Sequence, residues 1–132
     1  MSDYKFTLPI YGVVKPNKNN KNCALTFNWA MAANHWDYSK AKKKFSLMIQ
    51  DQLSRHDKIE GKLRINYKYY AARNGTDLDN FSIIARKFFQ DCLSKSGLVE
   101  DDNTKIIVKN SEEYMGIDKE NPRVEAFITV ID

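Results

Sequence analysis

Apolar and polar positions along this chain follow strand and helix periods in turn. The clearest strand pattern runs from Gly61 to Arg73, where apolar and charged residues alternate one by one, as in a half-buried strand. Tyr4 to Val14 predicts a first strand, with Pro9 at an edge or strand end. Residues 105–109 and 124–131 predict two closing strands, with a loop over residues 110–122 between them.

Two segments carry apolar residues at steps of three and four, which predicts helices. The first covers residues 27–53 and has a gap in its stripe near Asn34, so it forms one long helix or two in sequence. The second follows Asn80, whose side-chain oxygen can cap free N–H groups, and it ends at Gly97, a typical C-terminal residue. Its stripe consists of Phe81, Ile84, Phe88, Cys92 and Leu93.

This order of elements predicts an α+β fold in a single domain over residues 1–132, with one mixed sheet and two main helices packed on it. The length of 132 residues and a hydrophobic fraction of 42% are enough for one modest core. Neither a signal-peptide apolar segment nor a membrane span is recognisable, so we expect no membrane association. The two cysteines, Cys23 and Cys92, form no disulfide framework and are expected as reduced packing residues of a cytoplasmic protein.

Charge is divided unevenly along the chain. Residues 1–76 carry a formal charge of +9, whereas residues 77–132 carry −5. A basic half beside an acidic cluster is what a protein needs to bind a polyanion and to hold a cation next to it. The candidate phosphate contacts are the basic loop at residues 15–22, Arg73 at the bend before residue 77, and a lysine cluster on the first helix: Lys40, Lys42, Lys43 and Lys44. The alternative for these groups is an ordinary solvated surface.

The acidic residues that stand out lie at both ends of the second helix. Asp77 and Asp79 precede it, and Asp101 and Asp102 follow it in a short turn. If the two turns converge, three carboxylates form a hard oxygen site that suits Mg²⁺ or Mn²⁺ better than Zn²⁺. An EF-hand loop is excluded, because its sixth position requires glycine and holds Ser82 here. The alternative is that these residues only cap the helix and form turns.

The complete arrangement is more specific than any one pair of aspartates. The chain has Asp77-Leu78-Asp79-Asn80, then a helix, then a run from Lys95 to Asn103 that includes Gly97 and the Asp101-Asp102 pair. This order of motifs resembles the RusA family of Holliday junction resolvases. The lysine-rich segment from Asn28 to Phe45 is also similar to phage-type members of this family. These proteins are small endodeoxyribonucleases of bacteria and their phages.

The resemblance implies a Mg²⁺-dependent enzyme, with Mn²⁺ as a substitute, that resolves four-way DNA junctions by paired phosphodiester hydrolysis. It implies Asp77, Asp79 and Asp102 as catalytic metal ligands and an essential lysine on the intervening helix. Counted back from Asp102 that lysine is Lys87, with Arg86 as the fallback, whereas the count forward from Asp79 falls on Ile83. The resemblance also implies a homodimer in the bacterial cytoplasm, encoded by a phage or a chromosome.

Two other functions remain open from the sequence. One is a protein that binds branched or single-stranded DNA without turnover, which the lysine helix and the neighbouring tryptophans favour. The other is a nuclease with a different preference, for flaps or replication forks.

Overall fold

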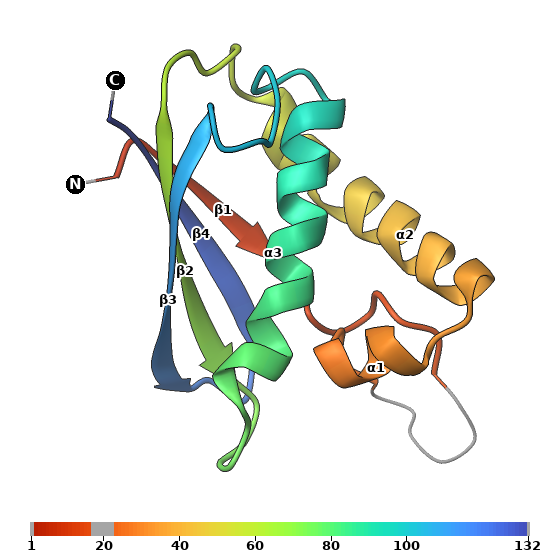
Figure 1. The fold of residues 1–132 in the computed structure, drawn as a ribbon. Helices are drawn as coiled ribbons and strands as arrows, with labels where there is room; N and C mark the ends of the chain where they lie inside the picture. Colours follow the sequence, from red (N-terminus) through yellow and green to blue (C-terminus); the bar gives the residue numbers. More distant parts are fainter. Residues whose placement is uncertain (1, 17–22, 132) are drawn as a thin grey trace.

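A computed structural model of the chain describes residues 2–16 and 23–131. It has four strands and three helices, which form one mixed sheet with the helices on one side of it (Figure 1). In chain order the elements are β1 (Tyr4–Leu8), α1 (Phe27–Ala32), α2 (His35–Ser54), β2 (Leu63–Ala71), α3 (Leu78–Lys95), β3 (Ile107–Ile117) and β4 (Arg123–Val130). The predicted α+β class with a mixed sheet is confirmed.

The strand order in the sheet is β1-β4-β2-β3, and the only parallel pair among the described strands is β2 with β3. Leu63 pairs with Ile107 at one end of this pair, and Ala71 pairs with Ile117 at the other. Parallel neighbours need a crossover between them, and α3 provides it. β2, α3 and β3 therefore form a βαβ unit, in which α3 runs back along the sheet (Figure 1).

The core lies between the sheet and the helices. Every second residue of β2 from Leu63 to Ala71 is buried, as its alternating sequence predicts. α3 buries its apolar stripe against this surface, and the Phe88 ring packs edge-on against the rings of Tyr38 and Phe45 on α2. A helix that packs between a sheet and a second helix is held in a fixed position, so the residues at its two ends are fixed as well.

The helix boundaries follow local sequence signals, with one exception. Asn34 divides residues 27–53 into two helices, because its side chain accepts a hydrogen bond from the Asp37 N–H and so starts α2. Gly97 has a φ of +79° just after α3, which confirms the predicted C-terminal residue. The expected cap by Asn80 is wrong: its Oδ1 accepts the N–H of Asn28 at 2.9 Å, so Asn80 caps α1.

Two strand predictions need correction. The first strand ends at Leu8 rather than Val14, and the segment that follows it instead lines a cleft described below. The predicted loop at residues 110–122 is mostly strand, because β3 continues to Ile117 along β2. β3 is an edge strand with polar residues on both faces, so its sequence lacks the alternation that marks a half-buried strand. Across the described residues, the helices are all too short or too polar to span a membrane.

Candidate functional site

The two acidic turns lie at opposite ends of α3. Asp77 and Asp79 are at its N-terminal end, after β2, whereas Asp102 follows its C-terminal end, before β3. The helix rises about 1.5 Å per residue, so the 16 residues from position 79 to position 95 separate these ends by about 24 Å. The predicted convergence of three carboxylates is therefore wrong within one copy of the chain, and the described residues contain no group of three metal-ligating side chains.

Asp102 instead belongs to a cluster at the far end of α3. Burial raises the pKa of Asp102, and hydrogen bonding to the carboxyl groups of Asp91 and Asp101 raises it further. Burial would also raise the pKa of Asp91, but Lys42 lies 2.5 Å from Asp91 and its charge lowers that pKa overall. Lys42 thus neutralises the Asp91 carboxylate, and the Asp102 carboxyl group lies within hydrogen-bonding distance of Asp91. Lys42 therefore differs from the other lysines of its cluster, Lys40, Lys43 and Lys44, which are exposed.

Asp77 and Asp79 have different surroundings. Asp77 occupies the N-cap position of α3 but its side chain makes no capping hydrogen bond, and Asp79 lies in the first turn. Both residues are exposed, and in the described part of the chain no lysine or arginine forms an ion pair with either carboxylate. Their oxygens are therefore available to a cation or to water.

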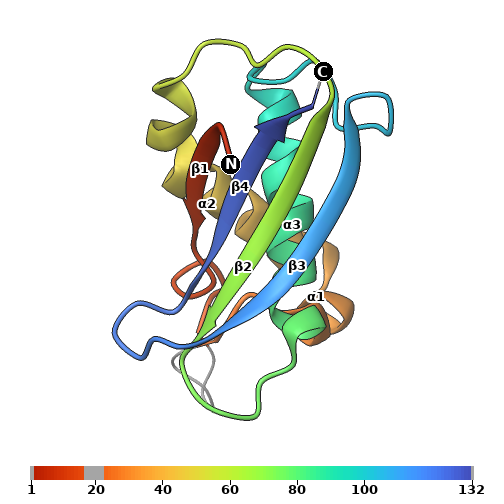
Figure 2. The same cartoon turned by 90° about the vertical axis from the view of Figure 1, so that its left-hand side faces the viewer.

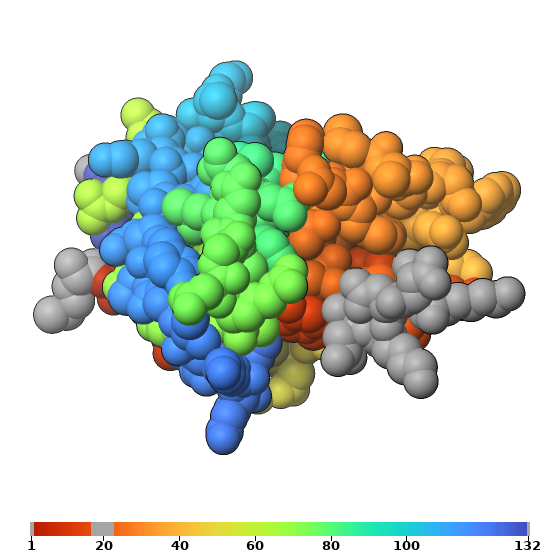
Figure 3. All heavy atoms as spheres, turned by 90° about the horizontal axis from the view of Figure 1, so that it is seen from below, coloured from red at the N-terminus to blue at the C-terminus, as the bar shows by residue number. Residues whose placement is uncertain are grey.

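A cleft of about 970 Å³ opens at the same end of α3, although neither carboxylate lines it, and we call it the basic cleft. Asn80 and Phe81, in the first turn of α3, form part of its wall. The rest comes from the segment after β1, from α1 and α2, from the end of β2, and from the turn between β3 and β4. Figure 3 shows the connection from β2 to α3 in green, between α1 in orange and the β3–β4 turn in blue.

The lining of the basic cleft has a strong charge bias. Arg73, Lys119 and Arg123 contribute cations, and among the described lining residues there is no aspartate or glutamate. Arg123 is already paired with Asp118 and Glu125, so Arg73 and Lys119 are the cations left for a ligand. The positive charge of this lining favours an anionic ligand such as a phosphate group.

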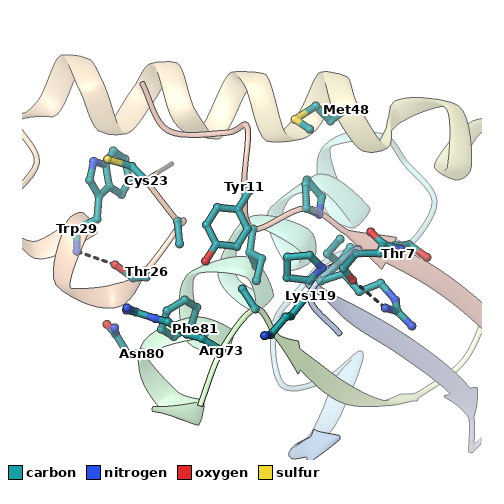
Figure 4. Close-up of a pocket in the computed structure, with 18 of the residues that line it drawn as sticks. Thr7, Tyr11, Cys23, Thr26, Trp29, Met48, Arg73, Asn80, Phe81 and Lys119 are labelled. Carbon is teal, nitrogen blue, oxygen red and sulfur yellow. Dashed lines mark hydrogen bonds between the residues drawn. The ribbon is translucent and has the colours of Figure 1, made fainter. Parts of the chain in front are cut away.

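Aromatic rings accompany these cations. Tyr11 lies in the middle of the cleft, with Arg73 and Phe81 on the side of α3 and Lys119 on the side of the β3–β4 turn (Figure 4). Trp29 of α1 also lines the cleft. Cations that bind phosphates and rings that contact sugars or bases together form the usual surface for nucleic acid.

The exposed lysines of α2 divide into two groups around this cleft. Lys44 and Lys40 are four and eight residues before Met48, which lines the cleft, so these side chains share one side of the helix. Lys43 is on the adjacent outer surface. Arg73, a candidate phosphate contact from the sequence, lines the cleft. The basic loop at residues 15–22 lies outside the described residues from residue 17 onward.

The three α3 positions considered for the lysine that the family resemblance implies have different surroundings. The Arg86 guanidinium is paired with the carboxylate of Glu112 on β3, and that carboxylate also accepts the Ser82 hydroxyl. Lys87 is exposed and makes no such contact with a described residue, whereas Ile83 is half-buried. Lys87 lies eight residues after Asp79, about 12 Å along the helix, on the same exposed side.

No protein-family model matches the chain, and a search of curated proteins also returns no match. Sequence patterns did not reveal Tyr11, Lys119 or Phe81 as cleft residues. The sequence predicts Tyr11 within the first strand and Lys119 within a loop. Residues that meet only after folding leave no periodic signal in the sequence, so the cleft could not be predicted from them.

Proposed function

We propose that the protein is a Mg²⁺-dependent endodeoxyribonuclease that acts on branched DNA, with the four-way junction as its substrate. The observation that carries the proposal is the basic cleft, which has no lining carboxylate and includes Asn80 and Phe81, the residues that follow the exposed Asp77 and Asp79 in the first turn of α3. The end of α3 that carries the two carboxylates therefore also forms part of the cleft wall. The resemblance of residues 77–103 to the RusA family gives the reaction and the substrate.

Two carboxylates fit Mg²⁺, because proteins often hold this ion with one or two carboxylates, several waters and the phosphates of the substrate. Asp77 and Asp79 would hold it, and the ion would neutralise the negative charge that develops during phosphodiester hydrolysis. Arg73 and Lys119 would hold the phosphates on either side of the reacting group. Lys87 would supply a further positive charge from the exposed side of α3.

Asp102 is too far from Asp77 and Asp79 to share a metal ion with them in one copy, so the proposal includes a dimer. In a two-fold dimer whose α3 helices lie antiparallel, the C-terminal end of one α3 would face the N-terminal end of the other. Asp102 of one copy would then complete the metal site that Asp77 and Asp79 begin in the other copy. Such a dimer would have two sites, as paired cutting of a symmetric junction requires.

The first experiment measures cleavage of a synthetic four-way junction in Mg²⁺, in Mn²⁺ and in chelator. We expect Asp79→Asn to reduce the cleavage rate more than about 100-fold while junction binding is retained, since loss of a ligand impairs the chemistry more than phosphate contact. Lys58→Gln, a charge change in the connection between α2 and β2 that does not line the cleft, should cleave like the wild type. Undiminished cleavage by Asp79→Asn, or in chelator, would exclude this site.

The second experiment tests whether the site is shared between copies. Asp79→Asn and Asp102→Asn are each inactive if both residues are ligands, and the two variants are then unfolded and refolded together. If the ligands come from different copies, a mixed dimer has one intact site, so nicking activity returns. If the ligands act within one copy, every site keeps one defect and no activity returns.

The separation of Asp102 from Asp77 and Asp79 favours a second candidate, a protein that binds branched or single-stranded DNA without cutting it. Arg73→Gln and Lys119→Gln would then weaken binding and each lower the salt dependence by about one phosphate contact. Nicking would be absent with every substrate. The same panel, with flaps and replication forks beside the junction, separates a junction resolvase from a nuclease of other selectivity.

A further inference from the structure

The sheet has a second face that none of the described helices covers. All three helices lie on one side, and Figure 2 shows the other side turned toward the viewer. We call this surface the open face. Because side chains alternate along a strand, the residues between the buried ones of β2 project onto it, namely Arg64, Asn66, Lys68 and Tyr70. A shallow groove of about 550 Å³ crosses it from β4 over β2 to β3.

Positive charge exceeds negative charge on the open face. Its cations are Lys5, Arg64, Lys68, Lys109 and Arg123, and its carboxylates are Glu113 and Glu125. Glu112 also borders the groove, but its carboxylate is paired with Arg86 of α3. Glu125 is almost buried and is neutralised by Arg123 at 2.8 Å and by Lys5 at 3.4 Å.

Three cations of the open face remain without an acidic partner. Arg64, Lys68 and Lys109 have no carboxylate within ion-pair distance among the described residues. All three border the shallow groove. This concentration of unpaired positive charge attracts an anionic partner.

One aromatic ring lies in the middle of these cations. Phe127 of β4 pairs directly with Lys5 on β1 and with Asn66 on β2. The ammonium group of Lys68 is 4.9 Å from the centre of its ring, and that of Lys5 is 5.9 Å away. Phe127 is only half-buried and borders the groove, so a flat ligand can reach the ring when the flexible lysine side chains move aside.

Polar groups order the surface next to this ring. The Asn66 amide donates to the Glu113 carboxylate at 2.7 Å, and its oxygen accepts the Ser111 hydroxyl at 2.8 Å. These contacts fix the Asn66 side chain beside Phe127 and engage the one remaining carboxylate of the open face. The ring, the ordered amide and the unpaired cations therefore lie on three neighbouring strands.

We propose that the open face binds single-stranded nucleic acid, with a base stacked on Phe127 and phosphates held by Arg64, Lys68 and Lys109. Four strands span three spacings of about 4.8 Å, so the face is about 14 Å wide, which suits two or three nucleotides. A double helix satisfies this surface less well, because its bases are stacked on one another and are not free to cover the ring.

A second copy of the chain is a poorer occupant. In a two-fold dimer through this surface, the same patch would face itself, and the unpaired cations of both copies would meet. An anionic membrane is also disfavoured, because the central ring is half-buried between strands rather than protruding. The proposal does not depend on the basic cleft or on hydrolysis.

The experiment measures binding of a fluorescein-labelled fifteen-nucleotide thymidine strand by anisotropy, with a duplex of equal length as comparison. We expect Phe127→Leu to weaken binding of the single strand about tenfold, since base–ring stacking contributes at that level. The double variant Lys68→Gln, Lys109→Gln should reduce the slope of log K against log salt by about 1.4, two phosphates at 0.7 each. Thermal unfolding confirms that each variant is folded.

Matched controls are Tyr114→Leu, an exposed ring of β3 beside Tyr69 on the side of the sheet that the helices cover, and the double variant Lys95→Gln, Lys105→Gln, which changes charge by the same amount elsewhere. Both should bind like the wild type. Equal affinity of the open-face variants and these controls would overturn the proposal, as would tighter binding of the duplex than of the single strand. The proposal would also be overturned if the open-face substitutions changed only the oligomeric state, or only the binding of anionic lipid vesicles.

Junction cleavage separates this inference from the proposed function. If both are correct, Phe127→Leu still cleaves the junction and Asp79→Asn still binds the thymidine strand. If Phe127→Leu loses cleavage but still binds the thymidine strand, only the open-face site is disproved. Absence of cleavage by the wild type, with strand binding that depends on Phe127, disproves only the nuclease.

Discussion

Replacement of Asp102 by asparagine should stabilise the fold at neutral pH. The folded protein raises the pKa of Asp102, mainly through burial and then through the carboxyl groups of Asp91 and Asp101. A carboxyl group with a raised pKa favours the folded state in its neutral form, so its contribution to stability is lost as the pH rises through that pKa. Asparagine has the same shape and stays neutral, so the loss does not occur.

The size of the effect is limited by solvent. Asp102 is half-buried, and Lys42 already neutralises Asp91 beside it, so we expect a gain of about 0.5 kcal/mol rather than several. The entropy of unfolding is about 2.1 cal/mol/K per residue, so in a chain of 132 residues this gain corresponds to roughly 2 °C in Tm.

The measurement is Tm by differential scanning calorimetry at pH 7 and near pH 4, for the wild type, Asp102→Asn and Asp101→Asn. The difference between Asp102→Asn and the wild type should be present at pH 7 and shrink toward pH 4, because the raised pKa favours the neutral form of Asp102 as the pH falls. Asp101→Asn should not stabilise, because the Asp101 carboxylate accepts the N–H of Asp102 at 2.7 Å and the amide of Asn103. A lower Tm for Asp102→Asn at pH 7 would refute the argument.

Three further changes test the packing that positions the site. Asn80→Ala removes the acceptor of the Asn28 N–H and should cost about 1 kcal/mol, with faster amide exchange in α1; unchanged exchange there would contradict the role of Asn80. Arg86→Gln leaves the Glu112 carboxylate without its cation and should cost about 2 kcal/mol in urea unfolding; an unchanged free energy of unfolding would mean that this ion pair does not stabilise the fold. Phe88→Ala opens a cavity under α2 and should cost about 3–5 kcal/mol; a loss below 1 kcal/mol would mean that the helices repack.

The sequence by itself determined the local elements and the distribution of charge. β2 and α3 were predictable because one face of each is buried, which produces regular periods of two and of 3.6 residues. Asn34 and Gly97 marked helix ends through the chemistry of their own side chains and backbone. The strand predicted at residues 105–109 covers only the start of β3, and the rest escaped prediction because an edge strand with exposed faces has no reason to alternate.

Only the tertiary structure decided which distant residues meet. The parallel pairing of β2 and β3 puts the start of α3 and its end at opposite ends of these strands, which separates Asp102 from Asp77 and Asp79. The predicted helix already implied this separation, because a straight helix of this length holds its two ends about 24 Å apart. The sequence pattern could not reveal the parallel pairing, because local periodicity is the same for parallel and antiparallel strands. The contact between Lys42 and Asp91, the basic cleft and the open face have the same origin, because each combines segments that are distant in sequence.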